Sequence, residues 1–140
     1  MKTTLSIVAL VLTISLSSFA GNMKSVNGIS VTHVMDHYLG YLIQGQGTLD
    51  ERLFTKDFEM TVYAQTNERK INKKQLVKFL KKTKGLSYDC ATSYKILDAS
   101  PRCTIVKASM AFEHFTRVDY ITLCLEKDDW KISRVVSTYP

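Results

Sequence analysis

The spacing of hydrophobic positions changes along the chain, and this change predicts where helices give way to strands. Between residues 30 and 43, apolar side chains recur at steps of three and four, the spacing of a helix with one buried stripe. Gly45 is placed to end this helix. A short helical turn over 49–54 follows, and apolar and polar residues then alternate over 58–65 as in a strand.

A second helix is marked at both of its ends. Asn72 is placed to cap the first turn, Gln75 stands three residues later as in a capping box, and Gly85 is suited to a left-handed stop. The face expected to point into the core consists of Leu76, Val77, Phe79 and Leu80. This pattern predicts a helix that packs along one side only.

Beyond Gly85 the helical period disappears, and four stretches typical of strands follow. They cover residues 87–97, 103–115, 117–126 and 130–138, and polar turns separate them. The order of two helical segments, a strand, a helix and four strands indicates an α+β domain. Its N-terminal helices should pack on one face of a curved, mainly antiparallel sheet.

The first 20 residues have the composition of a secretory signal peptide. A single cation precedes an apolar run over 5–16, and small residues lead up to a cleavage point after Ala20. We expect residues 21–29 to be a flexible lead-in and 30–140 to form one domain, periplasmic or secreted after cleavage. An uncleaved anchor is the alternative, but the rest of the chain holds no apolar run long enough for stable membrane insertion.

The charge of the chain is mildly basic and does not point to nucleic acid. The formal net charge is +6, of which Lys2 in the leader contributes one. Lysines crowd the second helix without interleaved aromatic residues, which favours a solvated surface over a nucleic-acid site. His33 and His37 lie beside the buried stripe of the first helix and not on it, so we expect them to be exposed. We expect neither a metal nor a cofactor.

Three cysteines, an odd number, raise the question of disulfide pairing in an oxidising compartment. If the hairpin between the two middle strands of the final four turns at 115–116, Cys124 faces Lys107. Cys103 then lies about two residue pairs away, beyond disulfide reach. The third cysteine, Cys90, has no evident partner. This register disfavours an internal disulfide.

Several short motifs together resemble the nuclear transport factor 2-like superfamily. They are Tyr38–Leu42, Leu53–Phe58, Asp119–Leu123 and Trp130–Ile132, within a resemblance that spans about residues 30–138. The Asp-Tyr strand followed by Trp-Lys-Ile is similar to the exported bacterial branch described as putative lumazine-binding or SnoaL-like. The resemblance implies a cone-shaped fold with a pocket between the helices and the concave sheet.

The same superfamily contains ketosteroid isomerase-like enzymes, in which a Tyr and a protonated Asp form an oxyanion hole. By motif context, Tyr38 and Asp119 match these two residues and would be the catalytic residues of an isomerase, dehydratase or cyclase. The position of the general base falls near Val62, where no carboxylate occurs, and Glu59 has the wrong strand parity. This departure favours a noncatalytic protein over an enzyme.

The residues and the family resemblance together predict an exported domain that binds a small hydrophobic or aromatic molecule in the cone pocket, as a homodimer. Asp119 shares its predicted face with apolar residues, so a neutral carboxyl that donates hydrogen bonds is expected. The ligand-binding residues would be Tyr38, Tyr41, Tyr63, Phe79, Met110, Phe112, Asp119 and Trp130. A third possibility is an interaction module that pairs through its open sheet face, with Lys107, Tyr120 and Thr122 in the interface.

Overall fold

The computed structural model describes residues 28–140, and all structural statements below concern that part of the chain. The predicted signal peptide and nearly all of the predicted lead-in lie outside the described residues. Ile29 is joined to the last strand, since its amide donates to the Asp129 carboxylate at 2.9 Å and its carbonyl accepts from Trp130 N at 3.0 Å. The globular fold therefore includes Ile29.

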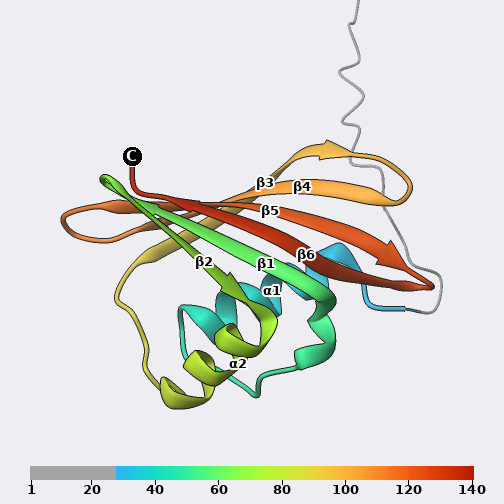
Figure 1. Cartoon of the computed structure of the whole chain (residues 1–140), viewed down its shortest axis with the longest axis horizontal. Helices are drawn as coiled ribbons and strands as arrows, with labels where there is room; N and C mark the ends of the chain where they lie inside the picture. Colours follow the sequence, from blue (N-terminus) through green and yellow to red (C-terminus); the bar gives the residue numbers. More distant parts are fainter. Residues whose placement is uncertain (1–27) are drawn as a thin grey trace, which may run out of the picture.

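Six strands form one sheet, and the two α-helices lie together on one side of it (Figure 1). The strands are β1 (Phe54–Ala64), β2 (Asn67–Asn72), β3 (Ala91–Ala99), β4 (Cys103–Ala111), β5 (Thr116–Glu126) and β6 (Asp129–Thr138). Their order is β2-β1-β6-β5-β4-β3. Only the β1–β6 pair among them is parallel. The predicted α+β class with a mainly antiparallel sheet is confirmed.

Helix α1 (Val31–Leu42) forms where the three-and-four spacing predicts it. Ser30 caps the helix by accepting a hydrogen bond from His33 N at 3.2 Å. Its buried stripe contains Val34, Met35 and Tyr38 and lies against the sheet. A short 3-10 turn, η1 (Glu51–Leu53), then leads into β1.

Helix α2 (Lys73–Lys82) carries the predicted capping box. Asn72 Oδ1 accepts from Gln75 N at 3.0 Å, and Gln75 Oε1 accepts from Asn72 N at 2.9 Å. The placement of Phe79 in the core was wrong, because its side chain is 53% exposed. Neighbouring residues on a helix point about 100° apart. The narrow stripe around Leu80 therefore leaves Phe79 on the solvent side.

The sequence pattern missed β2 and predicted too late a start for β1. Strand β2 pairs only with β1, so it is an edge strand, and nearly all of its residues are exposed. A strand that is exposed on both faces has no alternation of apolar and polar residues to reveal it. Strand β1 starts at Phe54, four residues earlier than predicted, where it pairs with Ile132 of β6.

The β4–β5 hairpin turns earlier than predicted, which changes the pairing of the two strands. Glu113 and His114 occupy its tip, closed by a 2.9 Å hydrogen bond from Phe112 N to Phe115 O. Because Phe115 stacks on Phe112 with ring centroids 4.5 Å apart, it belongs to the strand end and not to the turn. Cys124 therefore pairs with Cys103 and not with Lys107, a shift of four residues along β4, and this even shift leaves the same residues facing the core.

The two faces of the sheet have different surroundings. The inner face, which α1, η1 and α2 cover in part, carries the hydrophobic core. In the described part of the chain no helix covers the opposite, outer face (Figure 1). Lys107 and Tyr120 oppose each other there, and Thr122 lies on the same face two residues further along β5. Only the inner face can therefore hold a site between helices and sheet.

Candidate functional site

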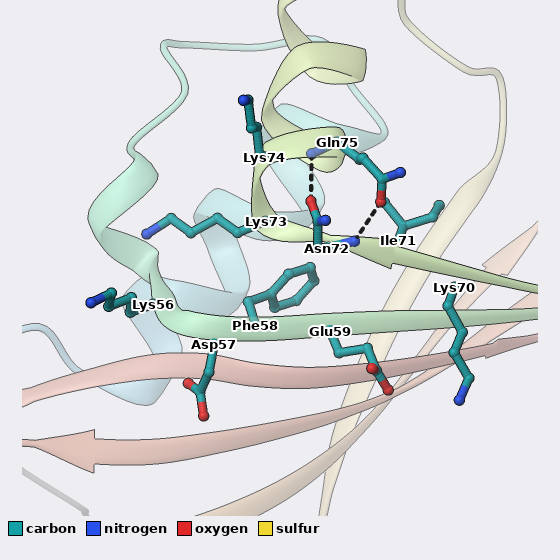
Figure 2. Close-up of a pocket in the computed structure, with 10 residues that line it drawn as sticks. All are labelled: Lys56, Asp57, Phe58, Glu59, Lys70, Ile71, Asn72, Lys73, Lys74 and Gln75. Carbon is teal, nitrogen blue, oxygen red and sulfur yellow. Dashed lines mark hydrogen bonds between the residues drawn. The ribbon is translucent and has the colours of Figure 1, made fainter.

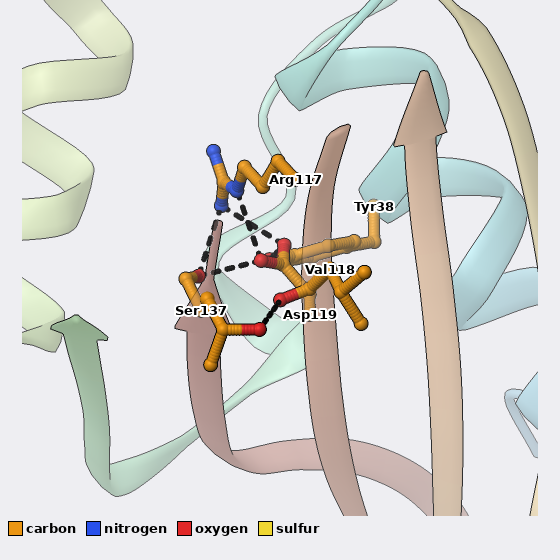
Figure 3. A network of polar contacts seen from close by, with 6 residues as sticks. Tyr38, Arg117, Val118, Asp119 and Ser137 are labelled. Atoms are coloured by element: carbon orange, nitrogen blue, oxygen red, sulfur yellow. Dashed lines mark hydrogen bonds and ion pairs between the residues drawn. The ribbon is translucent and has the colours of Figure 1, made fainter. Parts of the chain in front are cut away.

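A cluster of four polar side chains lies between α1 and the inner face of the sheet (Figure 3). We call Tyr38, Arg117, Asp119 and Ser137 the Asp119 cluster. Tyr38 Oη donates to Asp119 Oδ2 at 2.8 Å, and Ser137 Oγ donates to Asp119 Oδ1 at 2.5 Å. Arg117 contacts both carboxylate oxygens at 2.9 Å through Nε and Nη2. The carboxylate thus receives four hydrogen bonds.

Each member of the cluster is placed by the regular structure that carries it. Tyr38 belongs to the buried stripe of α1. Arg117 and Asp119 are two residues apart on β5 and therefore point to the same face. Ser137 is the β6 residue directly opposite Asp119, and its hydroxyl also accepts from Arg117 Nη2 at 3.3 Å.

The surroundings of Asp119 contradict the prediction of a neutral carboxyl group that donates hydrogen bonds. Asp119 is 0% exposed, and every polar atom directed at its oxygens is a donor. The two-point contact with the Arg117 guanidinium is the geometry of an ion pair. Arg117 is the first residue of the predicted strand 117–126 and was not predicted as a partner of Asp119.

Burial and charge together shift the proton affinities of two members of the cluster. Burial, reinforced by the nearby Asp119 charge, raises the pKa of Tyr38 well above its usual value. Burial alone would lower the pKa of Arg117, but the Tyr38 and Asp119 side chains outweigh it and raise that pKa. At neutral pH the tyrosine is therefore a neutral donor, and the arginine is a permanent cation.

Among the predicted ligand-binding residues, Tyr38 is hydrogen-bonded to Asp119, and Tyr38 and Tyr41 line the same small cavity. Met110 and Trp130 are buried in the hydrophobic core, and Tyr41 and Phe112 are partly buried at its edge. Tyr63 is 45% exposed and lies on the outer face, and Phe79 is exposed on α2. The predicted set does not form one cavity.

Side chains fill the space where the cone pocket was expected. A cavity beside Tyr38, between α1 and the first residues of β1, has a volume of only about 10 Å³. That is about the room for one water molecule, whereas small-molecule pockets in proteins measure about 300–1,000 Å³. The Asp119 cluster is bonded internally next to this closed cavity. The pocket therefore cannot lie at Tyr38 and Asp119 in this conformation.

A larger hollow, the α1–β3 groove, lies between the C-terminal half of α1 and the inner face of β3. Its volume is about 550 Å³. The lining includes Asp36, Leu39, Gly40, Gln46, Thr92 and Tyr94. Tyr94 pairs with Ala108 on the inner face and packs against the core, so its ring has a fixed place in the wall. The groove combines an aromatic ring with polar side chains.

A second hollow, the α2 groove, lies where β1 and β2 meet the start of α2 (Figure 2). Its volume is about 560 Å³, and four lysines and two carboxylates line it. The capping box occupies the first turn of α2, and Lys73 Nζ donates to the Phe54 carbonyl at 2.9 Å. Internal partners therefore engage Asn72, Lys73 and Gln75.

Residues 28–140 contain no group of three or more His, Cys, Asp and Glu side chains that could hold a metal ion. No helix in the same range is long and apolar enough to cross a membrane. His33 and His37 are both exposed, with ring centroids 4.4 Å apart on the surface of α1.

The fold is that of the nuclear transport factor 2-like α+β class. It is similar to a protein of that class of unknown function from Silicibacter pomeroyi DSS-3, with a TM-score of 0.63 and 11% identity over 78% of this chain and 92% of that one. The sequence profile of the family described as "Putative lumazine-binding" matches residues 28–139. The chain belongs to this family.

Two other solved structures show how varied the proteins with this fold are. A protein of the DUF3225 family with unknown function, from Pectobacterium atrosepticum SCRI1043, has a TM-score of 0.61 and 13% identity, over 79% of this chain and 88% of that one. A putative ketosteroid isomerase from Parabacteroides distasonis ATCC 8503 has a TM-score of 0.53 and 10% identity, over 77% and 86%. No curated protein sequence matches the chain.

Sequence reasoning missed Arg117 and Ser137, although each left a signal. Arg117 and Asp119 are separated by one residue, and on a strand whose inner face was already assigned this spacing places both on that face. Ser137 follows Val135 at the same two-residue step. Their contacts with Asp119 depend on side-chain geometry, which the spacing along a strand does not specify.

Proposed function

We propose that the chain is a noncatalytic domain that binds a small aromatic or hydrophobic molecule in the α1–β3 groove. The observation that carries this proposal is the groove itself, a hollow of about 550 Å³ with a tyrosine ring in its wall. This volume falls within the usual range of about 300–1,000 Å³ for small-molecule pockets. The family description supports a flat ring of the lumazine type as the ligand.

Gly40 gives independent support for a ligand at this place. Glycine inside a helix costs roughly 1 kcal/mol relative to alanine, so its presence in α1 needs a reason. A Cβ added at Gly40 would meet no atom within 4 Å, which means that packing within the chain does not require glycine. An open stretch of helix backbone in the groove would let a flat molecule approach closely.

The polar cluster supports binding over catalysis. In an oxyanion hole, Tyr38 and Asp119 would both direct hydrogen bonds at a substrate, whereas here Tyr38 donates to Asp119 and Asp119 only accepts. The position expected for the general base falls near Val62, which is not a carboxylate. Glu59 lies on the outer face of the sheet. The enzyme alternative would require the cluster to break and a base to come from elsewhere.

Ligand titration followed by amide NMR tests the proposal. The probes are lumazine and an anilinonaphthalene sulfonate dye, added to the 15N-labelled protein. We expect shifts at Gly40, Thr92 and Tyr94, and we expect Tyr94→Ala to weaken binding while Tyr88→Ala, a change of an exposed tyrosine outside the groove, leaves it intact. Shifts confined to the α2 groove, or no shifts with either probe, would contradict the proposed site.

A glycine substitution separates loss of binding from loss of folding. Gly40→Ala adds one methyl group to the groove wall and should raise the stability of the protein by roughly 0.5–1 kcal/mol, because alanine favours the helix. Weaker binding by this more stable variant would be a direct effect on the site. Unchanged affinity would argue against a ligand that contacts the α1 backbone.

We also propose that the protein is exported and loses its leader near Ala20, on the evidence of the leader sequence alone. Mass spectrometry of the protein purified from its native compartment measures the mature start. A chain that retains residue 1 would contradict cleavage. The ligand proposal does not depend on this outcome.

A further inference from the structure

Two cysteines that the sequence analysis separated are direct neighbours in the sheet. Cys103 at the start of β4 is paired with Cys124 near the end of β5. Both side chains are thiols and partly exposed. Cys124 Sγ contacts Ser133 Oγ at 3.4 Å. Burial, together with the neighbouring Cys124, raises the pKa of the Cys103 thiol.

The type of cross-strand position decides whether such a pair can be bridged. Hydrogen bonds join Phe112 N to Phe115 O and Leu125 N to Arg102 O, at 2.9 and 3.0 Å. Residue pairs along an antiparallel ladder alternate between hydrogen-bonded and non-hydrogen-bonded pairs, and these two contacts mark hydrogen-bonded pairs. The Cys103–Cys124 pair, one step from Arg102 and Leu125, is therefore of the non-hydrogen-bonded type.

Non-hydrogen-bonded pairs bring side chains closest together. Their Cα atoms lie about 4.5 Å apart, at the short end of the range of about 4.4–6.8 Å that disulfides span. The β4–β5 ladder runs from Cys103 to Ala111 without a register shift, so no bulge separates the two thiols. A disulfide can form here without rearrangement of the strands.

We propose that Cys103 and Cys124 are a redox modification site that forms an intramolecular disulfide with a small-molecule or protein disulfide as oxidant. One cysteine thiolate attacks a sulfur of the oxidant, which forms a mixed disulfide and releases one reduced thiol. The second cysteine then attacks the mixed disulfide, which closes the Cys103–Cys124 bond and releases the second reduced thiol. The oxidant takes up both electrons and the two cysteine protons.

Cys90 cannot take part in this bond. It precedes β3, whose first residue Ala91 pairs with Ala111 at the opposite end of β4 from Cys103. The eight residue steps from Ala111 to Cys103 span roughly 26 Å at about 3.3 Å per step. Cys90 is partly buried against the core, and burial together with Asp89 raises the pKa of its thiol. It is the natural internal control for a thiol without a partner.

The experiment measures disulfide formation in the dilute wild-type protein equilibrated with oxidised glutathione. The intact mass should fall by about 2 Da, one hydrogen from each thiol, and alkylation under denaturing conditions should label one cysteine where the reduced protein has three. Trypsin should release residues 103–107 joined to residues 118–127, while the peptide 85–95 carries the alkylated Cys90.

Variants and a thermal melt complete the test. Cys90→Ser should keep the mass loss, and Cys103→Ser or Cys124→Ser should abolish it. The oxidised wild type should melt several degrees above the reduced form, because the bond closes the β4–β5 hairpin and restricts the unfolded chain. The Cys103→Ser variant should show no such difference.

Three results would overturn the proposal. They are labelling of all three cysteines after oxidation, a mapped bond that includes Cys90, and a disulfide-linked dimer in place of the internal bond. Because the decisive measurement is made on the wild-type protein, it does not depend on whether a serine variant folds. The outcome is also independent of the proposed ligand, since the α1–β3 groove and these cysteines lie on opposite faces of the sheet.

Discussion

At the scale of single residues, the Asp119 cluster is a closed set of complementary charges and hydrogen bonds. Burial of a carboxylate is costly unless it is paired and hydrogen-bonded, and Asp119 meets both conditions through Arg117, Tyr38 and Ser137. Only the Arg117 side chain, 19% exposed, connects the cluster to solvent. This arrangement ties α1 to the middle of the sheet.

We predict that Asp119→Asn destabilises the protein by about 3–5 kcal/mol, because it leaves the Arg117 guanidinium mostly buried without a counter-charge. Urea unfolding measures the free energy of unfolding of each variant. The matched control is Asp119→Asn combined with Arg117→Met, which removes both charges and should cost less than the sum of the single changes. A single-variant effect within about 0.5 kcal/mol of wild type would show that the ion pair contributes little.

The raised pKa of Tyr38 predicts a loss of stability at alkaline pH. Above about pH 10 the unfolded chain releases the tyrosine proton, whereas the folded protein retains it. The unfolded state then binds fewer protons, so the free energy of unfolding falls as pH rises from about 10 towards the folded-state pKa. Below about pH 10, the ionisation of Tyr38 does not change the free energy of unfolding.

Tyr38→Phe isolates this contribution. The variant should lose stability at neutral pH, because Asp119 loses a donor, by about 1.5–3 kcal/mol for a bond to a charged group. Its stability should also decline less steeply than that of wild type above about pH 10. Urea unfolding at a series of pH values measures both effects, and parallel curves for the two proteins would contradict the shifted tyrosine.

At the scale of elements, the end of α1 packs against the segment that leads from α2 to β3. Gly45 has a positive φ of 63°, and a Cβ there would come within 2.5 Å of the Leu86 carbonyl oxygen. Gly47 also has a positive φ, of 77°, but a Cβ there would meet nothing within 4 Å. The close approach at Gly45 lies beside the contact from Tyr88 N to the Ile43 carbonyl at 2.8 Å.

These two glycines provide a matched pair of substitutions. Gly47→Ala should cost about 1 kcal/mol, the backbone strain of a left-handed residue. Gly45→Ala carries the same strain plus the collision with Leu86 and should cost at least 1 kcal/mol more than Gly47→Ala. Thermal or urea unfolding compares the two variants. Equal losses of stability would mean that the loop after α2 moves away from the new methyl group without cost.

At the scale of the whole molecule, the outer face of the sheet remains uncovered over residues 28–140. Tyr120 is exposed there, with Lys107 Nζ 5.9 Å from its ring centroid, and Ile105 next to them is also exposed. We propose that a second copy of the chain covers this face, in agreement with the expected homodimer. The interaction-module alternative uses the same face: the domain would pair through the outer face of the sheet and bind no ligand.

This proposal predicts that Tyr120→Glu converts a dimer into a monomer, because it places a charge at the centre of the buried interface. Sedimentation equilibrium measures the mass. Phe79→Glu is the control, since it changes an aromatic residue on α2 that is exposed to 53%, against 38% for Tyr120, and lies away from the outer face. A monomeric wild type at high concentration would refute the dimer, and a monomer produced by Phe79→Glu would place the interface elsewhere.

Much of the fold and part of the site could be predicted from the sequence, for reasons that differ from residue to residue. Tyr38 belongs to a helical stripe and Asp119 to a strand with clear alternation, so each could be assigned a face without a three-dimensional structure. Their contact was expected only through the family resemblance. Arg117 was missed although its spacing from Asp119 places both on one face, because the ion pair depends on side-chain contacts that strand periodicity does not specify.

The sequence by itself determined the features that depend on neighbours along the chain. These are the buried stripe of α1, the capping box of α2 and the inward-facing residues of β4 and β5, because helix and strand periods are local properties. The α+β class followed from their order.

The tertiary structure alone decided the features that depend on contacts between distant residues. It placed β2 at the sheet edge, β1 parallel to β6, and Cys103 opposite Cys124. It also closed the expected pocket around Tyr38 and left a groove beside β3, because side chains from separate elements fill one space and not the other. Register and cavities arise from packing between elements, and a local pattern does not contain that information.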